Sequence, residues 1–146
     1  MTVTLADLSD RTGLAVLDHL EREVTVPVIN GPQAQGDLIV IPHHLVADEA
    51  LLAHTTWTEV PAEGIELLRG ATGGNPHTLV ADPGTCQWTD DFWDSAMLAI
   101  GALRATAPVY LLHPEHGATG LTPGTYLIRR QREFDHRSRR QRIVAD

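Results

Sequence analysis

The histidines are the residues in this sequence best suited to chemistry. Eight are present, and His113 and His116 lie with Glu115 in the short segment LLHPEHG. Two imidazoles and a carboxylate are ligand types that zinc, iron and manganese accept. Positions 113 and 116 would face opposite sides of an extended strand, but Pro114 and Gly117 favour a turn. Such a turn could bring both rings to one side.

A third metal ligand would have to come from another part of the chain. His77, at the start of an apolar run in GGNPHTLV, is the best placed by type, and the pair His43 and His44 comes next. The alternative is a set of ordinary turn histidines that are solvated or hydrogen-bond to backbone carbonyls, because their spacing lacks the fixed frame of a helical zinc motif. We predict a site for a divalent transition metal (zinc, iron or manganese) formed by His77, His113, His116 and Glu115.

Other reactive side chains offer weaker indications. The single cysteine, Cys86, cannot form an internal disulfide and is most simply a buried core residue. The chain has no lysine, which excludes Schiff-base chemistry, and no serine lies in a G-x-S-x-G elbow. Asp90, Asp91 and Asp94 could hold a hard cation or simply form a solvated loop. The sequence does not establish an enzyme, although a metal-dependent one with Glu115 as the base remains an alternative.

Charge is distributed very unevenly along the chain. Residues 1–128 hold four arginines against 16 acids, a formal charge of −12, whereas residues 129–146 hold seven arginines against three acids, a charge of +4. We expect the basic end to contact an acidic protein or a second copy of the chain. Nucleic acid is the less favoured partner because the whole chain carries a charge of −8. The predicted interaction residues are Arg129, Arg130, Arg132, Arg137, Arg139, Arg140 and Arg142.

The elements that must position these residues are mostly short strands. Residues 4–22 are predicted to be helical, with a capping box of Thr4 and Asp7, and Gly13 could divide them into two helices. Short apolar runs bounded by turn residues then predict a mainly β fold, either a small barrel or a jelly-roll-like sandwich, with one or two short N-terminal helices. The predicted strands lie within 26–29, 38–41, 55–60, 65–68, 78–80, 85–88, 98–103, 108–112 and 126–128.

A chain of 146 residues is most simply one domain. We divide it into an N-terminal helical segment at 1–24, a β domain at 25–134 and an arginine-rich C-terminal tail at 135–146. No apolar run is long enough to span a bilayer, and the first residues do not resemble a secretory signal. We therefore expect a cytoplasmic protein without membrane contact.

Several motifs resemble those of a family of small, largely uncharacterised bacterial proteins. The family pattern has His-x-x-His before a short apolar strand, then Pro-Gly-x-Tyr and Arg-Gln-Arg-Glu-aromatic, as in HPEHGATGLTPGTYLIRRQREF here. The similarity covers roughly residues 36–42, 72–80 and 107–146. Where the family has Gly-His-x-His, this chain has Asn75 and His77, so one presumed ligand is an amide. The resemblance implies a compact β domain and no established activity. If relatives bind a metal through these histidines, the amide implies weaker binding or none here.

Two functional hypotheses follow from these observations. The first is a cytoplasmic binding protein with a histidine-lined pocket for a metal or another ligand. The second is an interaction or assembly module without an active site, in which the acidic body and the basic end of separate copies form a homo-oligomer.

Overall fold

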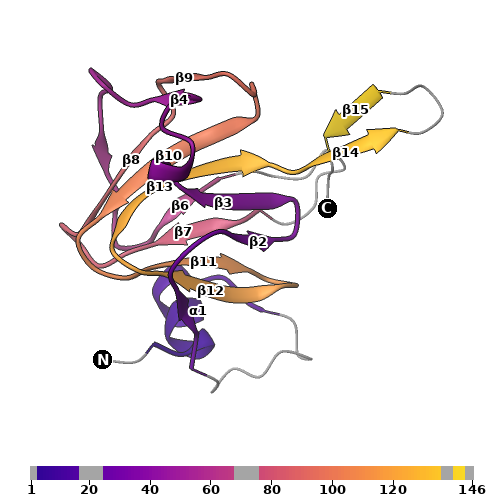
Figure 1. Cartoon of the computed structure of the whole chain (residues 1–146). Helices are drawn as coiled ribbons and strands as arrows, with labels where there is room; N and C mark the ends of the chain where they lie inside the picture. The colour runs from indigo at the N-terminus through magenta and orange to yellow at the C-terminus, as the bar shows by residue number, and fades with distance from the viewer. Residues whose placement is uncertain (1–2, 17–24, 68–75, 136–139, 144–146) are drawn as a thin grey trace.

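The computed structural model describes residues 3–16, 25–67, 76–135 and 140–143. The fold is mainly β, with one short helix near the N-terminus (Figure 1). Helix α1 (Leu5–Thr12) begins with the predicted capping box, because Thr4 Oγ1 accepts the Asp7 N–H and the Asp7 carboxylate accepts the Thr4 N–H. It ends at Gly13, whose φ of 71° is left-handed. The predicted helix over 4–22 was thus too long: residues 14–16 are not helical, and 17–24 lie outside the described residues.

Two sheets form the body of the molecule. The smaller sheet has five strands in the order β1-β12-β11-β7-β6, in which only β1 pairs in parallel, with β12. Its strands are β1 (Val28–Ile29), β12 (Gly117–Leu121), β11 (Val109–His113), β7 (Thr78–Val80) and β6 (Ile65–Glu66). The larger, antiparallel sheet has the order β2-β3-β13-β10-β8-β5. Its strands are β2 (Gln33–Gln35), β3 (Leu38–Pro42), β13 (Gly124–Arg130), β10 (Ala99–Ala105), β8 (Cys86–Thr89) and β5 (Thr58–Glu59).

Two further strand pairs lie outside these sheets. β4 (Ala50–Leu51) pairs with β9 (Trp93–Asp94), just after the short 3-10 helix η1 (His43–Leu45). β14 (Arg132–Asp135) pairs with β15 (Arg140–Ile143), and this hairpin projects away from the body (Figure 1). Part of the predicted C-terminal tail is therefore a strand.

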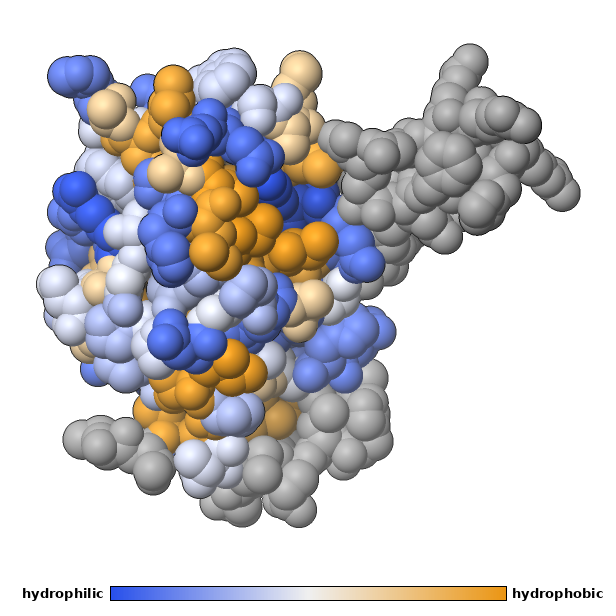
Figure 2. All heavy atoms as spheres, in the orientation of Figure 1, coloured by the Kyte–Doolittle hydropathy of each residue, from blue (hydrophilic) through white to orange (hydrophobic). Residues whose placement is uncertain are grey.

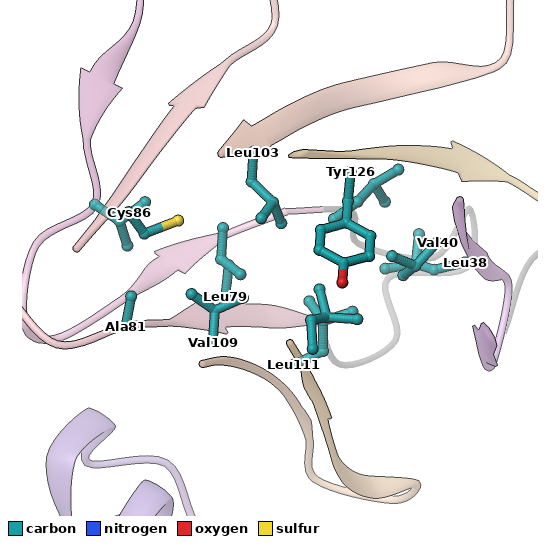
Figure 3. Close-up of a cluster of buried hydrophobic side chains, with 12 residues drawn as sticks. Leu38, Val40, Leu79, Ala81, Cys86, Leu103, Val109, Leu111 and Tyr126 are labelled. Atoms are coloured by element: carbon teal, nitrogen blue, oxygen red, sulfur yellow. The ribbon is translucent and has the colours of Figure 1, made fainter. Parts of the chain in front are cut away.

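The main core lies between the two sheets. Leu38 and Val40 of β3, on the larger sheet, belong to the same buried cluster as Val109 and Leu111 of β11, on the smaller one. Figure 3 shows these side chains pointing into the space between the sheets, beside the ring of Tyr126. Burial alternates along β3, as expected when one face of a strand lies against a core. Each fully buried leucine or valine contributes roughly 1.5–3 kcal/mol of transfer free energy.

This arrangement is sandwich-like. Neither of the two main sheets closes on itself within the described residues, so the barrel alternative was wrong. The jelly-roll-like connectivity stays a prediction. Each predicted strand overlaps an observed one, but β2, β4, β9, β12, β14 and β15 match none of the predicted ranges because their residues are polar, small or few. No helix in the described ranges combines the length and apolar character needed to cross a membrane.

Candidate histidine site

The three predicted histidines lie side by side. His77 precedes β7, His113 ends β11, and His116 lies in the turn that leads to β12. The antiparallel register places Leu112 opposite Thr78. His113, which follows Leu112, therefore lies next to His77, which precedes Thr78. The ring centroids are 4.5 Å apart for His77 and His113 and 4.4 Å apart for His113 and His116, whereas His77 and His116 are 6.4 Å apart. The three imidazoles thus form a row; we refer to them as the histidine cluster.

His77 is held by hydrogen bonds at both ring nitrogens. Its side chain is only 1% exposed; Nδ1 lies 2.8 Å from Gln35 Oε1 and Nε2 lies 3.0 Å from Asp37 Oδ1. The Gln35 amide nitrogen donates to the Leu111 carbonyl, which orients Oε1 toward the ring, so Nδ1 must carry a proton and donate it. A second proton lies between Nε2 and the buried Asp37 carboxyl. Because this pair is shielded from water, removing either partner would leave the other buried without this hydrogen bond.

His113 is fixed by the turn that follows it. This side chain is fully buried, and its Nδ1 accepts the backbone N–H groups of Glu115 (3.1 Å) and His116 (3.3 Å). Nδ1 therefore presents a lone pair, and the proton of the neutral ring is on Nε2. The turn predicted from Pro114 and Gly117 is thus closed by the imidazole itself.

The row runs from the surface to a buried carboxyl. Glu115 and His116 are exposed, His113 and His77 are buried, and Asp37 lies at the inner end. Within the described parts of the chain, no three histidine, cysteine or acidic side chains are grouped so that they hold a metal ion together. The metal site over His77, His113, His116 and Glu115 therefore stays a prediction. Asn75 lies outside the described residues.

The remaining histidine candidates lie elsewhere. His43 and His44 belong to η1, and the His43 ring nitrogen Nε2 lies 2.8 Å from the Ala50 carbonyl oxygen. That contact attaches η1 to β4, which is a structural role.

The first of the predicted interaction arginines is buried. Arg129 Nη2 lies 2.5 Å from Asp94 Oδ1, Arg129 Nε donates to Oδ2 at 3.3 Å, and Glu49 lies 3.7 Å away. Burial alone would raise the pKa of Asp94, but the hydrogen bond and charge of Arg129, together with backbone N–H donors, lower it below its usual range. This guanidinium joins β13 to β9, so Arg129 is not the surface contact that the sequence predicted.

For the other arginines of the basic end, the structure gives the position of each on its strand. Arg130 ends β13, Arg132 begins β14, and Arg140 and Arg142 lie on β15. The register sets Arg140 opposite Asp135 and Arg142 opposite Glu133. Residues of opposite charge therefore share two cross-strand positions. Arg137 and Arg139 lie outside the described residues.

Cys86 and the acidic residues do not form a second site. Burial raises the pKa of the Cys86 thiol to about 12, as expected for an unreactive core cysteine. Asp94 is committed to Arg129, whereas Asp90 and Asp91 are exposed. A surface pocket of about 540 Å³ is lined by residues of β8, β10 and the start of β13, and none of them belongs to the histidine cluster.

These features define a small, mainly β domain with a polar, histidine-containing site at the edge of its core. The chain belongs to the DUF8820 family, a domain of unknown function, whose model matches residues 34–131. The matched region runs from β2 to the end of β13 and includes the histidine cluster, Asp37 and Arg129, but neither α1 nor the β14–β15 hairpin. No curated protein and no solved structure matches the chain.

Proposed function

We propose that this chain is a small binding protein whose site is the histidine cluster and whose ligand is a divalent transition metal ion, of the class of zinc, iron or manganese. The convergence of three imidazoles, with a carboxyl at each end of the row, carries this proposal. Imidazole and carboxylate together are the donor set that these ions prefer among protein side chains.

The hydrogen bonds divide the cluster into two parts. Both His77 nitrogens already serve Gln35 and Asp37, so this ring acts best as a fixed support behind the site. His113 Nδ1, His116 and Glu115 are the ligands that we propose. His113 has the suitable tautomer, because its Nδ1 lone pair is directed at the turn and its proton is on Nε2.

Metal binding at His113 Nδ1 must open the turn. The two backbone N–H contacts that would be given up are worth about 0.5–1.5 kcal/mol each. A structural zinc site contributes on the order of 10 kcal/mol, so this loss is offset if Glu115 and His116 both bind the ion together with His113. Protons compete for the same lone pairs, so binding should weaken as the pH is lowered from about 8 to about 6.

Titration calorimetry with zinc and manganese, together with elemental analysis of protein purified without chelators, tests this proposal. We expect one ion per chain, and at least a roughly tenfold loss of affinity in His116→Ala and in Glu115→Gln. His44→Ala removes an exposed histidine of η1 and serves as the matched control, which should bind like the unaltered chain. Absence of binding, or equal binding by all variants, would show that the cluster is only structural.

A second candidate function, an assembly module, is favoured by a different observation. The basic β14–β15 hairpin projects from an acidic body (Figure 1). Association through this hairpin does not depend on a metal.

A further inference from the structure

The outer face of the larger sheet is covered over only part of its length. Because Leu103 belongs to the main core, its neighbours on β10, Ala102 and Arg104, face the other way. Ala102 is buried on that outer side in a separate cluster with Val46 and Ala50, which lie between η1 and β4. Arg104 is exposed. The uncovered part of the outer face therefore begins between these two positions of β10.

A row of four polar side chains crosses the uncovered part. The antiparallel registers pair Glu59 of β5 with Gln87 of β8, Gln87 with Arg104 of β10, and Arg104 with Thr125 of β13. Residues that are directly opposite on neighbouring strands share a face of the sheet. All four line the surface pocket of about 540 Å³, a volume typical of sites for small molecules. Figure 2 shows that hydrophilic residues predominate along the left side of the body, where β8 lies in Figure 1.

The guanidinium of Arg104 is already held in place. Its Nε donates to Gln87 Oε1 at 2.5 Å, and its Cζ lies 4.3 Å from the centroid of the Trp57 ring. These contacts use the Nε donor and one face of the group. Within the described residues Arg104 forms no ion pair, so its terminal nitrogens can bind a carboxylate through two parallel hydrogen bonds. A preorganised group of this kind loses little conformational entropy when a ligand binds.

Glu59 supplies a negative charge at the other end of the row. Its side chain is exposed, and its Oε1 lies beside Gly84, where an added Cβ would be 3.8 Å away. Among the residues that the structure describes, the Glu59 carboxylate has neither a hydrogen-bond nor an ion-pair partner. Gln87 lies between the two charged residues, and its amide nitrogen is available to the pocket because its oxygen already accepts from Arg104. The pocket thus presents a positive and a negative group with an amide donor between them.

We propose that this pocket binds a free α-amino acid, with the ligand carboxylate at Arg104 and the ligand ammonium group at Glu59. A ligand with a carboxylate alone would suit Arg104 but would also meet the negative charge of Glu59. An amine without a carboxylate would meet the opposite conflict. A molecule that carries both groups complements both residues.

The spacing of the strands favours a small zwitterion. Only β8 lies between the strands of Glu59 and Arg104, so their backbones are about 9.5 Å apart. Arg104 leans across β8 toward Trp57, which shortens the gap between the charged ends of the two side chains. A short gap suits a ligand whose carboxylate and ammonium group are attached to the same carbon. The small residues of the lining, such as Ala105 and Gly124, leave room for the side chain of the ligand.

NMR titration of the nitrogen-labelled full chain with each of the common L-amino acids tests this assignment. We expect at least one of them to shift the backbone amide signals of Gln87, Arg104 and Thr125. Its analogues that lack the amino group or the carboxyl group should bind at least roughly tenfold more weakly, because each loses a charge-assisted hydrogen bond.

Two variants separate the two ends of the ligand. Arg104→Gln should bind the amino acid roughly tenfold more weakly, and should bind the analogue without the carboxyl group at least as well as the unaltered chain does. Glu59→Gln should show the reverse pattern, with the analogue without the amino group bound at least as well. Glu63→Gln removes an exposed acid that does not line the pocket, so it is the matched control for Glu59→Gln and should keep its affinity.

The proposal is overturned if no amino acid shifts the pocket signals. It is equally overturned if both analogues bind as tightly as the amino acid, or if neither variant loses affinity. The amide spectrum of each variant shows whether it is folded, and exposed Glu59 keeps the test decisive if Arg104→Gln disturbs the sheet. His116→Ala should bind the amino acid with unchanged affinity, which separates this inference from the proposed metal site.

Discussion

The buried pair of His77 and Asp37 offers the most direct test of the site. Asp37 is 1% exposed, and its Oδ1 lies 3.0 Å from Nε2 of the His77 ring. Removing the carboxyl in Asp37→Ala leaves a buried ring nitrogen that has lost this hydrogen-bond partner. Leaving a buried polar group unsatisfied costs about 1–3 kcal/mol. We expect the free energy of unfolding to fall by that amount.

Asp37→Asn distinguishes this loss of charge from a loss of shape. The amide fills nearly the same volume and can donate to His77 Nε2, so one hydrogen bond to the ring is kept. We therefore expect a destabilisation of about 0.5–1.5 kcal/mol, smaller than that of Asp37→Ala. Nitrogen NMR shifts of this variant should report a proton on Nδ1 and none on Nε2, because Nδ1 must continue to donate to Gln35 while Nε2 accepts the amide.

Urea unfolding at neutral pH, with equal slopes for all variants, provides the measurement. Asp48→Ala is the control, since Asp48 is exposed and its removal should change stability by less than about 0.5 kcal/mol. If Asp37→Ala were no less stable than this control, the ordering of the histidine cluster by Asp37 would be wrong.

Two other features give independent predictions. Because Arg129 lowers the folded-state pKa of Asp94, the stability gained from this pair is present above the unfolded value of about 3.9 and is lost as the pH falls through the lowered pKa. Acid unfolding should therefore be steeper in the unaltered chain than in Asp94→Asn, and equal pH profiles would contradict the ion pair's contribution. At Gly101, an added Cβ would lie 2.1 Å from the Trp88 ring and 2.7 Å from the Thr89 carbonyl oxygen. Gly101→Ala should destabilise the domain by at least about 1–3 kcal/mol in thermal unfolding, whereas Gly13→Ala, which meets nothing within 4 Å, should cost only the left-handed strain at that turn.

Local patterns predicted the parts of the fold that depend on neighbouring residues. The capping box at the start of α1 and the alternation along β3 involve residues a few positions apart, so the sequence contains their full physical cause. The helix was predicted too long because leucines at helical spacing beyond Gly13 are only weak evidence for a helix. Strand β12 was missed because its sequence, GATGL, contains two glycines and no run of β-branched residues.

The candidate site was only half visible in the sequence. His113, Glu115 and His116 were suggested by their own spacing, whereas Gln35 and Asp37 were not among the predicted site residues. The available indication was an acid placed directly before the buried run LIVIP, where a carboxyl needs a partner. That partner, His77, is 40 positions away, and no local pattern connects the two.

The amino-acid order alone determined the strand-rich class, the first helix cap, the turn after His113 and the separation of an acidic body from a basic end. Each of these follows from propensity, periodicity or charge summed along the chain. Tertiary structure decided that His77 pairs with Asp37, that Arg129 is buried against Asp94, and that the β14–β15 hairpin projects from the body. These outcomes depend on which strands become neighbours, and desolvation then makes the polar groups brought together there pair with one another.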